Sequence, residues 1–169
     1  MLKNRVFHRI GIAAAALAAF SVAVPASAQA ATTTSPTCDW VCVLDVRAGA
    51  QTGYDRLVFD LSGGQPTINS TETGSNLYSP PSGETKELAI AGTSYLHLNL
   101  RGADTFDTAG TRIFANPIVQ PLSLPSIRGV QLTQDFEGRV EFVLSLGEHT
   151  RYNVSGLSSP ERIVVDVYH

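Results

Sequence analysis

The side chains best placed for chemistry lie along one expected strand. Tyr95, His97 and Asn99 alternate with leucines over residues 95–100, so they share the outer face of that strand. Arg101 extends the row if the strand continues to that position. Aromatic rings beside amide and guanidinium groups are the usual chemistry for contacting sugars or glycopeptides. We therefore predict a ligand-binding row at these positions, and the alternative is ordinary decoration of a sheet surface.

Catalytic signatures are absent from the sequence. It contains no HExxH, no GxSxG and no phosphate-binding glycine loop. His97 acting as a base for a serine of residues 70–85 is the enzymatic alternative, and a solvated strand histidine is the simpler interpretation. Asp104, Asp107 and Thr108 offer oxygen atoms to calcium, but their spacing matches no calcium-binding motif. We predict a protein that is not an enzyme, with no catalytic residue, no metal and no cofactor.

The N-terminal segment, residues 1–28, is typical of a removable export signal. It has three basic residues, then an apolar run over residues 10–24, and it ends in Ala-Ser-Ala, which a signal peptidase cuts after. The apolar run is too short to span a bilayer comfortably, so we expect no transmembrane segment after cleavage. Three of the twelve Lys and Arg leave with the signal, and nine remain against fifteen Asp and Glu. This acidity argues against nucleic acid and anionic membranes as partners and predicts a secreted, extracellular or cell-wall associated protein.

The two cysteines, Cys38 and Cys42, lie four residues apart in the exported part of the chain. On an extended strand their Cα atoms would be about 13 Å apart, whereas a disulfide needs roughly 4.4–6.8 Å. A bond between them therefore requires a turn in this segment. We predict this bond because exported proteins meet oxidising conditions. A bond to another chain and two free thiols are the alternatives.

Short strand patterns dominate the chain after the signal. Residues 29–40 are small and polar, typical of a flexible spacer, so we expect the domain over residues 41–169. Apolar and polar residues alternate between turns rich in Gly, Pro and Ser, and no segment has helical periodicity. This predicts an all-β fold, a sandwich or a barrel, with long irregular loops over 70–85 and 101–125. The expected strands cover residues 41–46, 54–61, 95–100, 130–133, 139–144 and 162–167, and a hairpin joins residues 87–90 to residues 95–100.

Two of these strands have similar sequences. DRLVFD and ERIVVD share the form acid, Arg, three apolar residues, Asp, and they occupy residues 55–60 and 161–166. If the two strands pair antiparallel in register, Arg56 faces Asp166 and Asp60 faces Arg162. Such opposed charges contribute about 0.2–1 kcal/mol and help to set the register. The alternative is that each Arg and Asp caps its own strand at the solvent edge.

Four segments together resemble a known family, the AMIN-like domain of exported actinobacterial proteins, which is related to the AMIN domain of cell-wall amidases and secretins. They are VRAGAQTGYDRLVFDLSG at 46–63, LAIAGTSYLHLNL at 88–100, Phe136-Glu137-Gly138, and LSSPERIVVDV at 157–167. The resemblance covers about residues 43–169. Its closing segment resembles the hallmark of the AMIN domain proper at Pro160, Arg162 and Asp166. We assign a structural motif to these residues and to Asp55, Arg56 and Asp60 of the similar strand.

The resemblance implies a small two-sheet β-sandwich and an envelope function. It implies a non-catalytic binding and targeting module that docks to peptidoglycan or another cell-wall polymer, and it defines no catalytic residues. Many relatives are lipoproteins, whereas Cys38 lacks the lipoprotein box, so we expect no lipid anchor. The alternatives are a module that binds an exported partner protein and, less favoured, a hydrolase that uses His97 with a loop serine. A carrier with an apolar cavity is disfavoured because the apolar positions suffice to fill a small sandwich.

Overall fold

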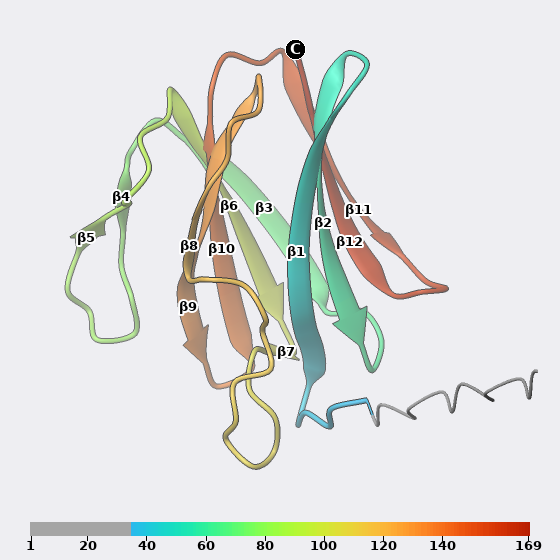
Figure 1. The fold of residues 1–169 in the computed structure, drawn as a ribbon. Coiled ribbons are helices and arrows are strands. Elements are labelled where there is room, and N and C mark those ends of the chain that lie inside the picture. The colour runs from blue at the N-terminus through green and yellow to red at the C-terminus, as the bar shows by residue number, and fades with distance from the viewer. Residues whose placement is uncertain (1–34) are drawn as a thin grey trace, which may run out of the picture. The chain divides into compact units, whose positions relative to one another are not determined.

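The structure, a computed structural model, describes residues 35–169. The expected export signal at residues 1–28 lies outside the described residues. Within them the chain forms twelve β-strands and no helix, which confirms the all-β prediction (Figure 1). The strands are β1 (Val41–Gln51), β2 (Tyr54–Ser62), β3 (Thr67–Thr73), β4 (Leu77–Tyr78), β5 (Lys86–Glu87), β6 (Ser94–Arg101), β7 (Ala103–Asp104), β8 (Val119–Pro121), β9 (Ile127–Phe136), β10 (Arg139–Leu146), β11 (Arg151–Leu157) and β12 (Arg162–Tyr168).

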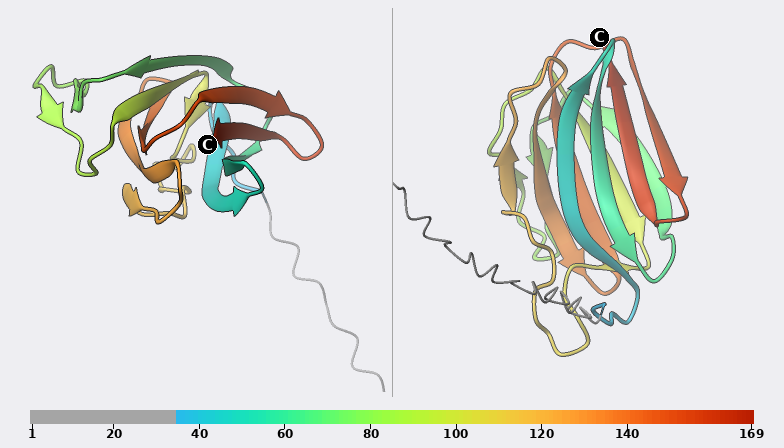
Figure 2. Two further views of the ribbon diagram at one scale, coloured as in Figure 1. Left: turned by 90° about the horizontal axis from the view of Figure 1, so that it is seen from above. Right: turned by 45° about the vertical axis from the view of Figure 1, so that its right-hand side comes forward.

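Ten of these strands form two five-stranded sheets that pack face to face as a β-sandwich (Figure 2). The first sheet has the order β11-β12-β2-β1-β7, and the second has the order β3-β6-β10-β9-β8. β4 and β5 pair only with each other and stand beside the second sheet (Figure 1). The sandwich therefore agrees with the fold that the resemblance implies, and not with a closed barrel.

The core lies between the sheets because each strand turns its alternating apolar side chains inward. Phe59 of β2 contacts Phe142 of β10, with ring centroids 4.7 Å apart, and Phe142 also meets Phe114. Burying one such side chain contributes about 1.5–3 kcal/mol to stability. The largest fully buried side chains are Phe59, Phe142, Leu57, Leu96, Leu98, Leu100, Ile127, Leu144, Leu146, Ile163, Val43 and Val130.

The predicted pairing of the two similar strands is confirmed. β2 and β12 are antiparallel neighbours, with Arg56 opposite Asp166 and Asp60 opposite Arg162. The Arg56 guanidinium donates two hydrogen bonds to the Asp166 carboxylate, at 2.7 and 2.8 Å. Asp60 behaves differently, because it accepts two hydrogen bonds from Arg47 of β1, at 2.9 and 2.8 Å. β1 pairs with β2 on the side opposite β12, so Asp60 has a cation on either side, and Arg47 is the one that binds it.

These two ion pairs allow a matched comparison of stability. Arg56→Ala should lower the free energy of unfolding by about 1–3 kcal/mol, because it leaves the mostly buried Asp166 carboxylate without its charged partner. Arg47→Ala should cost less than about 1 kcal/mol, because both groups of its pair are more exposed. Urea denaturation of both variants checks the ranking, and equal losses would contradict it.

The hairpin expected over residues 87–100 is wrong. β5 pairs with β4, and β6 pairs instead with β3 and β10. Residues 88–93 cross the outer face of the second sheet, where Leu88 packs in a small cluster with Tyr95 and Val143. The expected loop over 70–85 is also partly strand, since β3 extends to Thr73. Local alternation marks residues 87–90 as half-buried, but it does not say whether a strand or a covering loop buries them.

The predicted disulfide between Cys38 and Cys42 is present. The Cα atoms are 5.6 Å apart, and the chain bends at Asp39 and Trp40 before β1 begins. The bend meets the geometric condition that an extended strand fails. The carbonyl of Thr37 accepts a hydrogen bond from the Thr108 amide, at 2.9 Å. The described end of the expected spacer is therefore attached to the domain from Thr37 onward.

Candidate functional site

The outer face of the second sheet carries its outward side chains in rows, because β3, β6, β10 and β9 are antiparallel and in register. The first row is Thr67, Arg101, Arg139 and Phe136, and the second is Asn69, Asn99, Glu141 and Gln134. Residues 88–93 cover part of the rows beyond these two. There the Ala89 amide donates to the Gln131 side chain, and the Ser145 hydroxyl donates to the Ile90 carbonyl. The first two rows therefore carry most of the exposed side chains of this face.

Two of the four residues expected to line a binding row are not on the open surface. Tyr95 is only 5% exposed, and its hydroxyl accepts a hydrogen bond from the Gly92 amide at 3.0 Å. The expectation of an exposed Tyr95 is wrong, because residues 88–93 lie over its side chain. His97 is mostly buried, with Nδ1 3.0 Å from the Glu141 carboxylate. Asn99 and Arg101 are exposed, as expected.

Six residues of the first two rows, with Leu100, line a hollow of about 580 Å³, here called the face hollow. Its surface offers three amide side chains and two guanidinium groups. Amides and guanidinium groups are the polar groups that orient a sugar or peptide ligand by hydrogen bonds. The lining residues are Thr67, Asn69, Asn99, Leu100, Arg101, Gln134 and Arg139.

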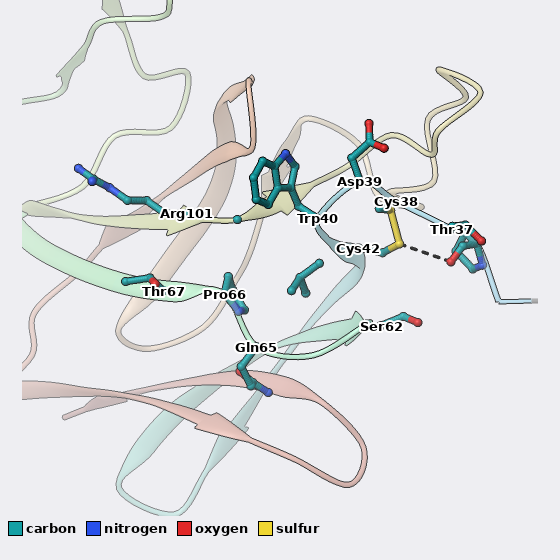
Figure 3. Close-up of a pocket in the computed structure, with 14 residues that line it drawn as sticks. Thr37, Cys38, Asp39, Trp40, Cys42, Ser62, Gln65, Pro66, Thr67 and Arg101 are labelled. Carbon is teal, nitrogen blue, oxygen red and sulfur yellow. Dashed lines mark hydrogen bonds between the residues drawn. A yellow bond between two sulfur atoms is a disulfide. The ribbon is translucent and has the colours of Figure 1, made fainter.

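A second hollow of about 550 Å³, here called the end hollow, lies at the end of the sandwich beside the disulfide (Figure 3). Trp40 and Arg101 lie along one side of it, and Gln65 and Pro66 lie along another (Figure 3). Thr67 and Arg101 line both hollows, so the end hollow and the face hollow adjoin. The combined surface joins an aromatic ring to a strip of hydrogen-bonding side chains.

Trp40 is exposed but firmly positioned. Its side chain is 56% exposed, its amide donates to the Asp104 carboxylate at 3.1 Å, and the disulfide closes the bend that carries it. A Cβ atom at Gly138 would lie 2.6 Å from Nε1 of Trp40, so the indole rests against this glycine. Alternation does not mark Trp40 as a binding residue. Its signals in the sequence are that it is the one tryptophan and that it lies between the two cysteines.

Comparison with known families identifies the domain type of this chain. The family model for the AMIN-like domain matches residues 41–169. This chain belongs to the AMIN-like domain family. AMIN-like domains are in general non-catalytic binding modules related to the cell wall. The comparison with curated proteins found no match to this chain.

The AMIN-like domain is also found in exported proteins, and the disulfide agrees with a location outside the cytoplasm. The part of the chain that the structure describes has no helix of the length and apolar character needed to cross a membrane.

The residues that we expect to form a structural motif of the AMIN-like domain line neither hollow. Asp55 is fully buried, and its Oδ2 accepts hydrogen bonds from the amides of Ser126 and Ile127, at 2.5 and 3.0 Å. Because Asp55 is in the first sheet and Ile127 begins β9, these bonds link the two sheets. Pro160 follows a cis peptide bond in the turn before β12. Asp55 and Asp166 therefore each hold neighbouring elements of the sandwich together.

The acidic loop of the AMIN-like domain uses its oxygen atoms internally. The Asp107 carboxylate accepts hydrogen bonds from the amides of Ala109 and Thr111, at 3.0 and 2.8 Å. Asp104 accepts from the Trp40 amide, and burial raises the pKa of its carboxyl. Among the described residues, no group of three His, Cys, Asp or Glu side chains could hold a metal ion. The loop therefore organises its own backbone and the base of Trp40.

Glu141 of the AMIN-like domain should make stability depend on pH. Burial raises the pKa of this carboxyl, but hydrogen bonds from His97 and Thr133 outweigh burial and leave the pKa below its ordinary value. A carboxyl with a lowered pKa stabilises the fold above its unfolded pKa, and the contribution is lost as pH falls through the folded pKa. The wild type should therefore lose its advantage over Glu141→Gln below about pH 4. Urea denaturation of both proteins from pH 7 to pH 3 measures this difference, and a constant gap would contradict the expectation.

Proposed function

We propose that this protein is an exported, non-catalytic module that binds peptidoglycan through the end hollow and the face hollow. The observation that carries the proposal is the exposed Trp40 ring, held beside a strip of amide and guanidinium groups on an AMIN-like domain. An aromatic ring stacks on the apolar face of a sugar, and amide side chains hydrogen-bond to its hydroxyl and acetamido groups.

The charge and the expected export of the chain support the same ligand. The exported part carries more acidic than basic residues, which disfavours nucleic acid and anionic membranes. The disulfide and the N-terminal signal pattern agree with a protein that meets the cell wall. His97 binds a carboxylate, and in the described part of the chain it makes no hydrogen bond to a serine, so the geometry does not favour the hydrolase alternative.

Co-sedimentation with purified sacculi tests the proposal. The mature protein, obtained after export, should sediment with sacculi at both low and high salt. Trp40→Ala should raise the apparent Kd about tenfold, because it removes the stacking surface. Leu157→Ala is the matched control, since it removes an exposed apolar side chain from the first sheet and should bind as the wild type does.

Two results would overturn parts of this proposal. A wild-type protein that stays in the supernatant at both salt concentrations would show that the module does not bind peptidoglycan. Sedimentation that is equal for the wild type and Trp40→Ala would show that the ligand sits elsewhere on the domain.

A second candidate function, binding of an exported protein, is favoured by one apolar groove. Phe106 and Ile118 are exposed large apolar side chains that line it with Leu132 and the side chain of Arg112. Apolar centres with a charged rim are common in protein interfaces. A photo-crosslinking residue at position 106 should trap one defined protein in growing cells, whereas the same residue at position 157 should not. Equal trapping at both positions would contradict this candidate.

A further inference from the structure

Arg101 and Arg139 face each other on the open part of the second sheet. They are direct register partners on β6 and β10, and both side chains are exposed. Their chain neighbours Leu100 and Val140 are buried in the core, so the two arginines point to the outer face. Cβ atoms of directly opposed residues lie about 4.5–5.5 Å apart, and like charges in this position destabilise a sheet. The fold therefore holds two cations together without a structural benefit from their mutual contact.

Neither arginine of this pair forms an ion pair with a carboxylate of the described residues. The row continues to Thr67 on one side and Phe136 on the other, and both are uncharged. Among the described residues, the ion pairs of the structure join other groups, and none includes Arg101 or Arg139. The carboxylate in the next row, Glu141, already accepts hydrogen bonds from Thr133 and Asn99 and binds His97.

Two other arginines of the sandwich have a carboxylate partner, unlike this pair. Arg47 and Arg56 each make a two-bond pair with an aspartate of a neighbouring strand. The exported chain is also acidic overall, so carboxylates are plentiful. Two opposed arginines therefore concentrate positive charge in a hollow whose other polar lining groups are amides and a hydroxyl.

We propose that Arg101 and Arg139 together bind a carboxylate or phosphate group of the ligand in the face hollow. This assignment rests on the proposed function, and it names the chemistry of the group that the wall polymer presents there. A guanidinium fork binds two oxygens of an oxyanion at once, and opposed forks can share one anion. Asn99 and Gln134 border the same space and offer hydrogen bonds to the atoms beside the anion. Arg101 also lines the end hollow, so one polymer chain can contact Trp40 and the anion site together.

A titration with simple anions tests the site without the wall. The mature protein is titrated with inorganic phosphate and, separately, with acetate, while the NMR signals of the arginine Nε–H groups are followed. Signals of Arg101 and Arg139 should shift together and saturate. Arg101→Gln and Arg139→Gln should each weaken binding at least tenfold, whereas Arg101→Lys should weaken it less because the charge remains. Arg151→Gln, an exposed arginine of the first sheet, is the control and should bind as the wild type does.

The two anions distinguish the sources of the group. A stronger response to phosphate assigns the site to a phosphate-bearing wall polymer, and a stronger response to acetate assigns it to the peptide carboxylates of peptidoglycan. Absence of a shift with both anions would overturn the anion site. So would an Arg139 signal that shifts equally in the wild type and in Arg101→Gln.

Sacculi binding separates this failure from failure of the proposed function. If the wild type binds phosphate or acetate but not sacculi, the anion site is supported and binding to peptidoglycan is contradicted. If the wild type binds sacculi through Trp40 but neither anion shifts the arginine signals, binding to peptidoglycan is supported and the anion site is contradicted.

Discussion

Phe142→Ala should lower the free energy of unfolding by about 3–5 kcal/mol, as expected for a buried phenylalanine that contacts two other rings. Phe142 is almost fully buried between the sheets, where it meets Phe59 of the first sheet and Phe114. Its removal deletes the contact that joins the two layers and leaves a cavity that close-packed neighbours fill only in part. Small domains are stable by about 5–15 kcal/mol, so the variant loses a large share of its stability.

Thermal and urea denaturation of Phe142→Ala measure this loss. Phe136→Ala is the matched control, because Phe136 is in the neighbouring strand β9 but is about half exposed. The control should change stability by about 0.5 kcal/mol or less. A loss below about 2 kcal/mol in Phe142→Ala would show that the ring cluster is not the centre of the core.

Asp55→Ala should lower the free energy of unfolding by about 2–5 kcal/mol. The Asp55 carboxylate is the acceptor for two buried backbone amides, those of Ser126 and Ile127. Each buried N–H left without an acceptor costs about 1–3 kcal/mol. The loss arises where β9 enters the second sheet, so the start of that strand should also lose protection from hydrogen exchange.

Asp55→Asn serves as the control for this prediction. Asparagine keeps one oxygen that can accept from both amides, and its NH₂ group replaces Oδ1, which has no hydrogen-bond partner among the described residues. It should therefore be less destabilised than Asp55→Ala. Denaturation and hydrogen exchange of both variants measure the order, and an Asn variant as unstable as the Ala variant would show that the acceptor is not what matters.

The candidate site depends on the same packing of β6 and β10 that forms the core. Leu100 and Val140 anchor the strands inward, and that packing presents Arg101 and Arg139 outward. Trp40 depends on the disulfide bend and on Gly138, which has room for the indole because it lacks a side chain. Changes to Gly138 should therefore reach the ligand through Trp40 as well as through the fold.

Local patterns in the sequence determined much of this protein. Alternation of apolar residues predicted the all-β class, and the matching DRLVFD and ERIVVD segments predicted the pairing of β2 with β12. Both predictions are confirmed because alternation indicates which face of a strand is buried, and opposed charges on two strands indicate the register in which they pair. The expected export predicted a bond between Cys38 and Cys42, and their spacing predicted the turn that this bond requires.

Only the tertiary structure decided the composition of the site. Tyr95 alternates as an outward residue, yet residues 88–93 fold over it, and alternation cannot show that an outward face is covered by a distant segment. Arg139 joins Arg101 through the pairing of strands far apart in the chain, and Trp40 joins them through contacts at the end of the sandwich. Asp60 has two cations within reach, and the packing of β1 selects Arg47. Each of these outcomes depends on contacts between segments that are far apart in the sequence. Local patterns do not record such contacts, so tertiary packing determines them.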